Sequence, residues 1–117
     1  RASLARALVG HPSVLLLDEP LGALDAFTRM NLQDEILDIW KKYNMTVVMV
    51  THDVDEAIYM SDQVVVMSAR PSKVEALIDI DLPRPRARAQ DTFQEYRSKI
   101  LEILNFGGKI EEAEYYL

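Results

Sequence analysis

The chain has 117 residues, with 13 Lys and Arg against 19 Asp and Glu, so its formal net charge is −6. Hydrophobic residues make up 49% and charged residues 27%, which is typical of a globular domain and unlike a disordered or fibrous chain. The acidic balance argues against nucleic acid as a partner, because phosphate binding needs a basic surface, and the lack of Cys excludes disulfides, thiolate metal sites and a cysteine nucleophile.

The chain begins in a helical pattern. Leu4, Ala5 and Leu8 share one helix face, and Gly10 and Pro12 end the pattern. We interpret this beginning as the inside of a helix of a longer protein, the alternative being a trimmed but intact domain. No apolar run approaches the roughly 20 residues that span a bilayer, and no signal peptide is visible.

Three short apolar runs predict β-strands, at 14–17, 46–50 and 64–67. None of them alternates apolar with polar residues, which is typical of parallel strands that are buried on both faces. The segment 74–80 is interrupted by acidic residues and predicts a strand near the edge of a sheet.

Three helices are expected between and after these strands. Asp25 predicts the N-cap of a long helix that ends near Tyr43, where Asn44 lets the chain turn, and a short helix is expected over 54–60. A last helix is expected from Thr92, with Glu95 completing a capping box and Gly107-Gly108 ending it. The apolar stripes expected to face the core are Leu32, Ile36, Ile39, Trp40 and Tyr43 in the long helix, and Phe93, Tyr96, Ile100, Leu101 and Leu104 in the last one.

The segment 82–91 contains two prolines in Leu-Pro-Arg-Pro-Arg and predicts a linker between a core at 1–81 and a C-terminal helix and tail at 92–117. We interpret its arginines, Arg84, Arg86 and Arg88, as solvated. The alternative is a site for a regulatory anion or for membrane headgroups.

Strands alternating with helices indicate an α/β fold with parallel strands. Asp18 and Glu19 follow the first strand and His52 follows the second, so in neighbouring parallel strands they lie at the same edge of the sheet, about 5 Å apart in the pairing direction. Two carboxylates and an imidazole suit metal-assisted hydrolysis: one carboxylate holds Mg²⁺, the other activates water, and the imidazole binds a phosphoryl oxygen. The alternative is ordinary solvation and capping at strand ends.

The run VLLLDEPLGALD at 14–25, joined to Thr51-His52 with His52 33 positions after Glu19, resembles the second half of the nucleotide-binding subunit of an ABC transporter. The resemblance covers Arg1 to about Ile80. The run ASLARAL at 2–8, the segment Asp-Val-Asp-Glu-Ala from Asp53 and the proline-rich linker are similar to importer ATPases of the nitrate, sulfonate, taurine and bicarbonate group.

This resemblance implies part of a P-loop NTPase core with parallel strands, an edge strand and a C-terminal helix. It implies ATP and Mg²⁺ as cofactors, with Asp18 ending the Walker B strand and placing Mg²⁺ through water. Glu19 resembles the general base, Asp25 the D-loop residue that reaches the opposing site of a dimer, and His52 the switch histidine that contacts the γ-phosphate. Phosphoryl transfer fits this set, because it needs charge neutralisation and a positioned water.

The resemblance further implies an ATPase that powers import of a small anion or sulfonate from the cytoplasmic face of the cell membrane. Its partners would be a second copy of itself, a transmembrane permease and, indirectly, a solute-binding protein, with no nucleic acid. Two alternatives remain open: an ABC ATPase without a transport role, and a non-enzymatic interaction module that uses its sheet face and terminal helix.

A phosphate cradle of the form G-x-x-x-x-G-K-[ST] is missing from the sequence. The one Gly-Lys pair, Gly108-Lys109, is followed by Ile110, and Ile103 stands where the first Gly belongs. We therefore expect this chain alone neither to bind ATP tightly nor to hydrolyse it. In the family the P-loop strand lies between the strands at 46–50 and 64–67, so these two are expected not to pair directly.

Overall fold

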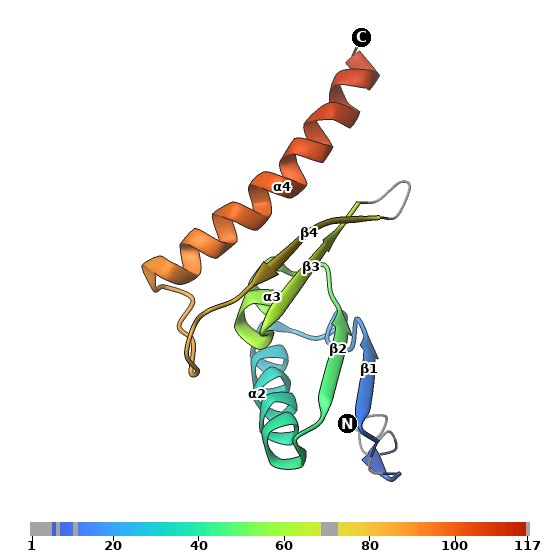
Figure 1. Ribbon diagram of the computed structural model, residues 1–117, viewed down its shortest axis with the longest axis vertical. Helices are drawn as coiled ribbons and strands as arrows, with labels where there is room; N and C mark the ends of the chain where they lie inside the picture. The colour runs from blue at the N-terminus through green and yellow to red at the C-terminus, as the bar shows by residue number, and fades with distance from the viewer. Residues whose placement is uncertain (1–5, 7, 11, 69–72, 117) are drawn as a thin grey trace. The chain divides into compact units, whose positions relative to one another are not determined.

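The computed structural model of the chain describes residues 6, 8–10, 12–68 and 73–116, with the backbone course alone for 105–116. Its elements in chain order are β1 (Val14–Asp18), α2 (Ala26–Tyr43), β2 (Thr46–Val50), α3 (Val54–Met60), β3 (Gln63–Met67), β4 (Val74–Asp79) and α4 (Asp91–Tyr116) (Figure 1). The chain forms two compact units, 1–52 and 53–117. Most of the helix expected at 1–8 lies outside the described residues.

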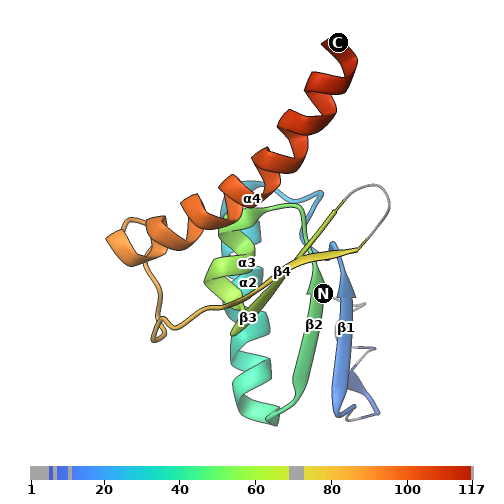
Figure 2. The same cartoon turned by 45° about the horizontal axis from the view of Figure 1, so that its top comes forward.

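The first unit confirms the predicted parallel strands. β1 and β2 pair in parallel, from Val14 opposite Thr46 to Asp18 opposite Val50. α2 connects the two strands and lies beside them (Figure 2), as a parallel pair requires a long crossover. The buried hydrophobic residues of this unit are Leu15, Leu21, Leu32, Ile36 and Met45.

The expectation that these strands are buried on both faces is wrong for the described structure. Leu16 is 74% exposed, and its neighbour across the ladder, Val48, is 50% exposed. Val14 and Val50 are also about half exposed on the same strands. Because successive side chains of a strand point to opposite faces, one face of the pair packs inward and the other is an uncovered apolar surface.

The ends of α2 follow the local signals in the sequence. Asp25 is the N-cap, and its side chain accepts the Thr28 N–H; Asn44 ends the helix in the left-handed conformation, at φ 49°. Of the expected stripe, Leu32 and Ile36 are buried, Ile39 and Trp40 are half-buried, and Tyr43 is exposed. Gln33 is buried as well, which the apolar pattern did not indicate.

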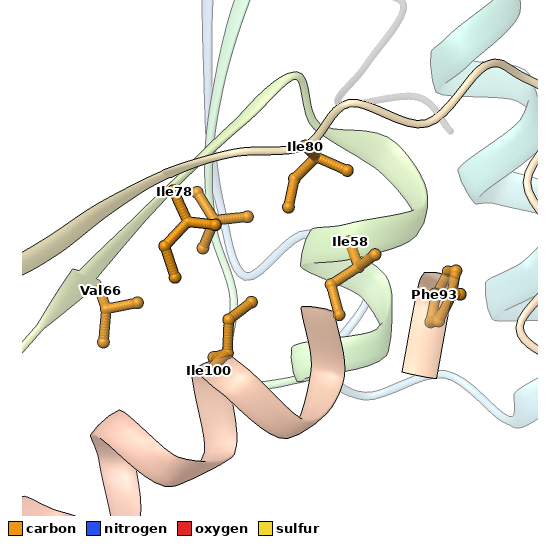
Figure 3. Close-up of a cluster of buried hydrophobic side chains, with 7 residues drawn as sticks. Ile58, Val66, Ile78, Ile80, Phe93 and Ile100 are labelled. Atoms are coloured by element: carbon orange, nitrogen blue, oxygen red, sulfur yellow. The ribbon is translucent and has the colours of Figure 1, made fainter. Parts of the chain in front are cut away.

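The second unit is an antiparallel hairpin covered by two helices. β3 pairs with β4, from Gln63 opposite Asp79 to Met67 opposite Val74, which confirms a strand after residue 73. Among the described residues β3 and β4 form a two-stranded sheet of their own. The core of the unit joins α3, the hairpin and α4 (Figure 3), and its residues are Ile58, Val64, Val66, Ile78, Ile80, Phe93 and Ile100.

Helix α4 differs from its prediction at both ends. It begins at Asp91, and the Gln90 carbonyl accepts the Gln94 N–H at 3.1 Å, so Thr92 lies inside the first turn and the capping box at Thr92 is wrong. The helix also continues through Gly107-Gly108 to Tyr116. An interior glycine costs only about 1 kcal/mol relative to alanine, and the run KIEEAEYY that follows is rich in helix-forming residues.

The stripe of α4 is confirmed at Phe93, Tyr96 and Ile100. Ile103 packs against the core, whereas Leu104 is 42% exposed. The spacing of three, four and three residues keeps Ile103 on the same helix face, because a helix has 3.6 residues per turn. No helix among the described residues combines the length and apolar character needed to cross a membrane.

The segment 82–90 has no helix or strand, as expected, but its arginines are not solvated. Arg86 is only 5% exposed and donates hydrogen bonds to the carbonyl oxygens of Ile58 and Ser61, at 2.6 Å each, and of Leu82 at 2.9 Å. Burial, followed by the positive charge of Arg84, lowers the pKa of the Arg86 guanidinium.

The neighbouring arginines bind the same region of the second unit. Arg84 donates to the Met60 carbonyl at 2.8 Å and to the Asp62 carboxylate at 2.9 Å, and the Arg88 guanidinium lies 4.6 Å from the centre of the Tyr59 ring. The last carbonyls of a helix lack partners within the helix and carry partial negative charge, so donors from the segment satisfy the C-terminal end of α3. The interpretation of these arginines as solvated is therefore wrong.

The first prediction concerns Arg86. We expect Arg86→Met to lower the free energy of unfolding of the chain by about 2–4 kcal/mol, because several buried carbonyls lose a charged donor. Urea denaturation measures the change. Arg84→Met is the matched control, since Arg84 is less buried; an effect of Arg84→Met equal to or larger than that of Arg86→Met would contradict the assignment.

The second prediction concerns pH. Hydrogen bonds from Thr28, first from its backbone N–H and then from its hydroxyl, lower the pKa of Asp25 below its ordinary 3.8. The ionised cap therefore stabilises α2 fully above pH 3.8 and loses this effect as the pH falls through the lowered value. We expect the stability advantage of the wild type over Asp25→Asn, which keeps a capping oxygen but cannot titrate, to shrink in that window in thermal unfolding experiments. An advantage that grows on acidification would refute this.

Candidate active site

The candidate site forms where β1 and β2 end. The Glu19 N–H donates to the Val50 carbonyl at 2.8 Å, so the pairing continues one residue past β1. Asp18, the last residue of β1, lies opposite Val50. Because the strands are parallel, the residues that follow Asp18 and Val50 leave the sheet at the same edge.

Glu19 and His52 meet at this edge. Nε2 of His52 contacts Oε1 of Glu19, as a hydrogen bond that becomes an ion pair when the imidazole is protonated. The side chains are 90% exposed for His52 and 43% exposed for Glu19. The structure thus brings together two of the residues that the sequence placed at one sheet edge, in a position that an approaching ligand can reach.

The backbone of Glu19 adopts the left-handed conformation, at φ 46°. This conformation costs a residue with a Cβ about 1–2 kcal/mol relative to the right-handed one. Two hydrogen bonds hold it, from the Glu19 N–H to Val50 and from the Gly22 N–H to the Glu19 carbonyl at 3.4 Å. Strained positions of this kind cluster at functional sites, where they aim a side chain.

The loop between Glu19 and α2 is fixed from two sides. Leu21 is buried, and its carbonyl accepts the Leu24 N–H at 3.3 Å. Nη2 of Arg29, in the first turns of α2, lies 3.3 Å from the Leu24 carbonyl and 3.5 Å from the Gly22 carbonyl. The backbone of the loop that connects Glu19 to Asp25 is therefore held by hydrogen bonds and by the burial of Leu21.

Sequence reasoning missed Arg29. A signal was present, because the positive end of the helix dipole disfavours a cation near a helix N-terminus, and α2 carries no acidic residue in its first turn. An arginine near the start of a helix therefore indicates that its guanidinium binds acceptors outside the helix, which here are the carbonyl oxygens of Gly22 and Leu24.

The capping contact of Asp25 was expected from the sequence, whereas the hydrogen bond to its second carboxylate oxygen was not. Its two carboxylate oxygens accept the Thr28 N–H and the Thr28 hydroxyl, at 2.9 Å each. These hydrogen bonds lower its pKa, so the group stays ionised. The Asp25 carboxylate thus caps the start of α2 and is not part of the contact between Glu19 and His52.

Asp18 is exposed at the end of β1. The described residues contain no group of three or more His, Asp or Glu side chains that could hold a metal ion by themselves. Mg²⁺ at nucleotide sites takes one or two carboxylates and completes its octahedron with water and phosphate oxygens. The adjacent carboxylates of Asp18 and Glu19 fit that donor set.

The chain is similar to known proteins over nearly its whole length. No family model matches the chain. An aliphatic sulfonates import ATP-binding protein (SsuB) of Bacillus cereus is 51% identical over 113 residues, which cover 97% of this chain and 45% of that protein. The protein of the same name from Bacillus subtilis is 47% identical over 115 residues, 98% of this chain and 44% of the relative.

A third relative comes from an archaeon. An uncharacterized ABC transporter ATP-binding protein of Methanocaldococcus jannaschii is 54% identical over 104 residues, which cover 89% of this chain and 39% of that protein. The chain thus spans less than half the length of these relatives.

About half of all positions are identical over nearly the whole chain, and the α/β fold with parallel strands is the one that the residues predicted. The chain belongs to the ATP-binding subunits of ABC importers, of which it corresponds to a part.

Proposed function

We propose that this chain carries the hydrolytic residues of an ABC importer ATPase, and that the complete subunit hydrolyses ATP to ADP and phosphate to power import. The observation that supports this most is the contact of Glu19 with His52 at the ends of two parallel strands. A carboxylate beside a donor imidazole, both open to solvent, suits attack of water on a phosphoryl group.

In this proposal Glu19 is the general base. Its carboxylate accepts a proton of the attacking water, and its strained backbone, held by Val50 and Gly22, fixes the direction of the side chain. The Nε2–H of His52, which now meets Glu19, is the donor for an oxygen of the terminal phosphate. Asp18 holds Mg²⁺ through water, and the metal supplies neutralisation of phosphate charge when bound.

We further propose that the subunit acts as a homodimer and that Asp25 contributes at the surface between the copies. The capping contacts of Asp25 with Thr28 support a role in holding this loop in shape. A carboxylate that also reaches an opposing site would share its oxygens between Thr28 and that site.

The names of the relatives support the transport assignment. SsuB proteins are named for import of aliphatic sulfonates, and we propose a small sulfonate or related anion as the imported solute here. The partners would be a permease in the membrane and, through it, a solute-binding protein, with the ATPase on the cytoplasmic face. The same names weigh against an ABC ATPase without a transport role.

The uncovered face of β1 and β2 gives further support. Leu16 and Val48 form an exposed apolar pair in the described chain, and the relatives are more than twice as long as the matched part. Burial of such a face by another layer of the subunit is favourable by roughly 25 cal/mol for each Å² of apolar surface. This favours part of a larger ATPase over a self-contained interaction module.

The third prediction tests Glu19. In the complete subunit we expect Glu19→Gln to lower kcat for ATP hydrolysis by at least about 100-fold, because the amide cannot accept the proton of water, while nucleotide binding persists. Phosphate release and equilibrium binding of a fluorescent ATP analogue measure the two properties. Glu95→Gln, at an exposed glutamate of α4, is the matched control. Wild-type turnover in Glu19→Gln would remove Glu19 from the role of base.

The fourth prediction concerns the chain by itself. We expect isothermal titration of the 117-residue chain with Mg-ATP to give no micromolar affinity, because its sequence contains no phosphate cradle of backbone N–H groups and lysine. The complete subunit is the positive control under the same conditions. A micromolar dissociation constant for the chain alone would contradict this proposal.

A further inference from the structure

The loop that follows Glu19 contains two turns, one after the other. The Glu19 carbonyl accepts the Gly22 N–H at 3.4 Å, and the Leu21 carbonyl accepts the Leu24 N–H at 3.3 Å. A hydrogen bond across three residues is typical of a β-turn, but both distances exceed the usual length of about 2.9–3.0 Å. Because these bonds are long and therefore weak, the shape of the loop depends on further support.

The core supports the loop at Leu21. This side chain is 3% exposed and fixes the first turn to the first unit. The next two residues, Gly22 and Ala23, are exposed, and Gly22 has no side chain that could pack. The second half of the loop can therefore be held through its backbone carbonyls.

Arg29 holds these carbonyls from the first turns of α2. Its backbone N–H donates to the Asp25 carbonyl at 2.9 Å, which fixes its place in the helix. Since the side chains of a helix are tilted toward its N-terminus, the Arg29 side chain runs back to the loop. Its Nη2 carries two hydrogens and lies 3.3 Å from the Leu24 carbonyl oxygen and 3.5 Å from that of Gly22. One guanidinium thus ties both carbonyls to the helix.

The series of hydrogen bonds continues from Arg29 to Glu19. Gly22 accepts from Arg29 through its carbonyl and donates through its N–H to the Glu19 carbonyl. On its other side Glu19 donates its N–H to the Val50 carbonyl at 2.8 Å. These bonds hold Glu19 at φ 46°, a conformation that is unfavourable for a residue with a Cβ, while its side chain meets His52.

We propose that Arg29 is a positioning residue for hydrolysis. By holding the carbonyls of Gly22 and Leu24, it keeps Glu19 in the left-handed conformation that directs the carboxylate to His52 and to the attacking water. The inference rests on the proposed role of Glu19 as the base. Without the guanidinium the turn at Gly22 can relax, and even a small displacement of a catalytic group lowers the rate.

The first arm of the experiment compares two cations of α2 in the complete subunit. We expect Arg29→Gln to lower kcat for ATP hydrolysis by roughly 3- to 10-fold, with the KM for ATP nearly unchanged, since the loss is made in the transition state. Lys41→Gln removes an exposed cation near the other end of α2 and should keep wild-type kcat. Wild-type kcat in Arg29→Gln, or an equal loss in Lys41→Gln, would overturn the inference.

The second arm asks whether Arg29 acts through Glu19. Single-turnover hydrolysis is measured in Glu19→Gln and in the double variant with Arg29→Gln. If Arg29 only positions the Glu19 carboxylate, Arg29→Gln slows the Glu19→Gln subunit no further, because the group that it positions is already gone. A merely structural role would slow both backgrounds by the same factor, and such multiplied losses would overturn the inference.

A second variant keeps the test valid if Arg29→Gln lowers the thermal midpoint strongly. Arg29→Lys keeps the charge and the aliphatic stem but loses the planar fork of donors. We expect it to lower kcat by roughly 2- to 5-fold, again only when Glu19 is present. A loss that persists in the Glu19→Gln background would contradict positioning.

Glu19→Gln by itself separates the two proposals. If it lowers kcat by at least about 100-fold but the variants of Arg29 keep wild-type kcat, the positioning inference is overturned and the proposed function stands. If Glu19→Gln turns over normally, the proposed function fails and the inference about Arg29 fails with it.

Discussion

The parallel pairing of β1 with β2 is the constraint on which the candidate site depends. The ladder extends to the hydrogen bond between the Glu19 N–H and the Val50 carbonyl, and this bond brings the side chain of Glu19 to the imidazole of His52. A shift of the register by one residue would turn every side chain of β1 to the other face. The contact of two residues far apart in sequence is therefore a direct result of backbone pairing.

The two units solve the same problem of helix ends in different ways. In the first unit the solution is local, since Asp25 caps the start of α2 and Asn44 closes its end. In the second unit the end of α3 relies on Arg84 and Arg86, more than 20 residues further along the chain. Local caps form together with the helix itself. The hydrogen bonds from Arg84 and Arg86 form only when the segment that carries these arginines has packed against α3.

This difference explains what the sequence could predict. Strand positions, the Asp25 cap, the Asn44 turn and the meeting of Glu19 with His52 follow from short-range patterns and from the direction of parallel strands. The burial of Arg86 could not be predicted from the sequence, because arginine side chains are mostly exposed in proteins. Its carbonyl partners also belong to other elements, far from it in the chain. The uncovered face at Leu16 was missed for a related reason: an apolar run reports that a strand can be buried, not what covers it.

At Glu19 the backbone conformation that lowers stability and the carboxylate proposed for hydrolysis belong to the same residue. Glycine adopts this conformation without the cost that a Cβ brings, so a search for thermostable variants would favour glycine at this position. Such a variant would gain robustness and lose the carboxylate. Screens that select for heat resistance alone would therefore enrich chains in which this turn is relaxed and the group facing His52 is gone.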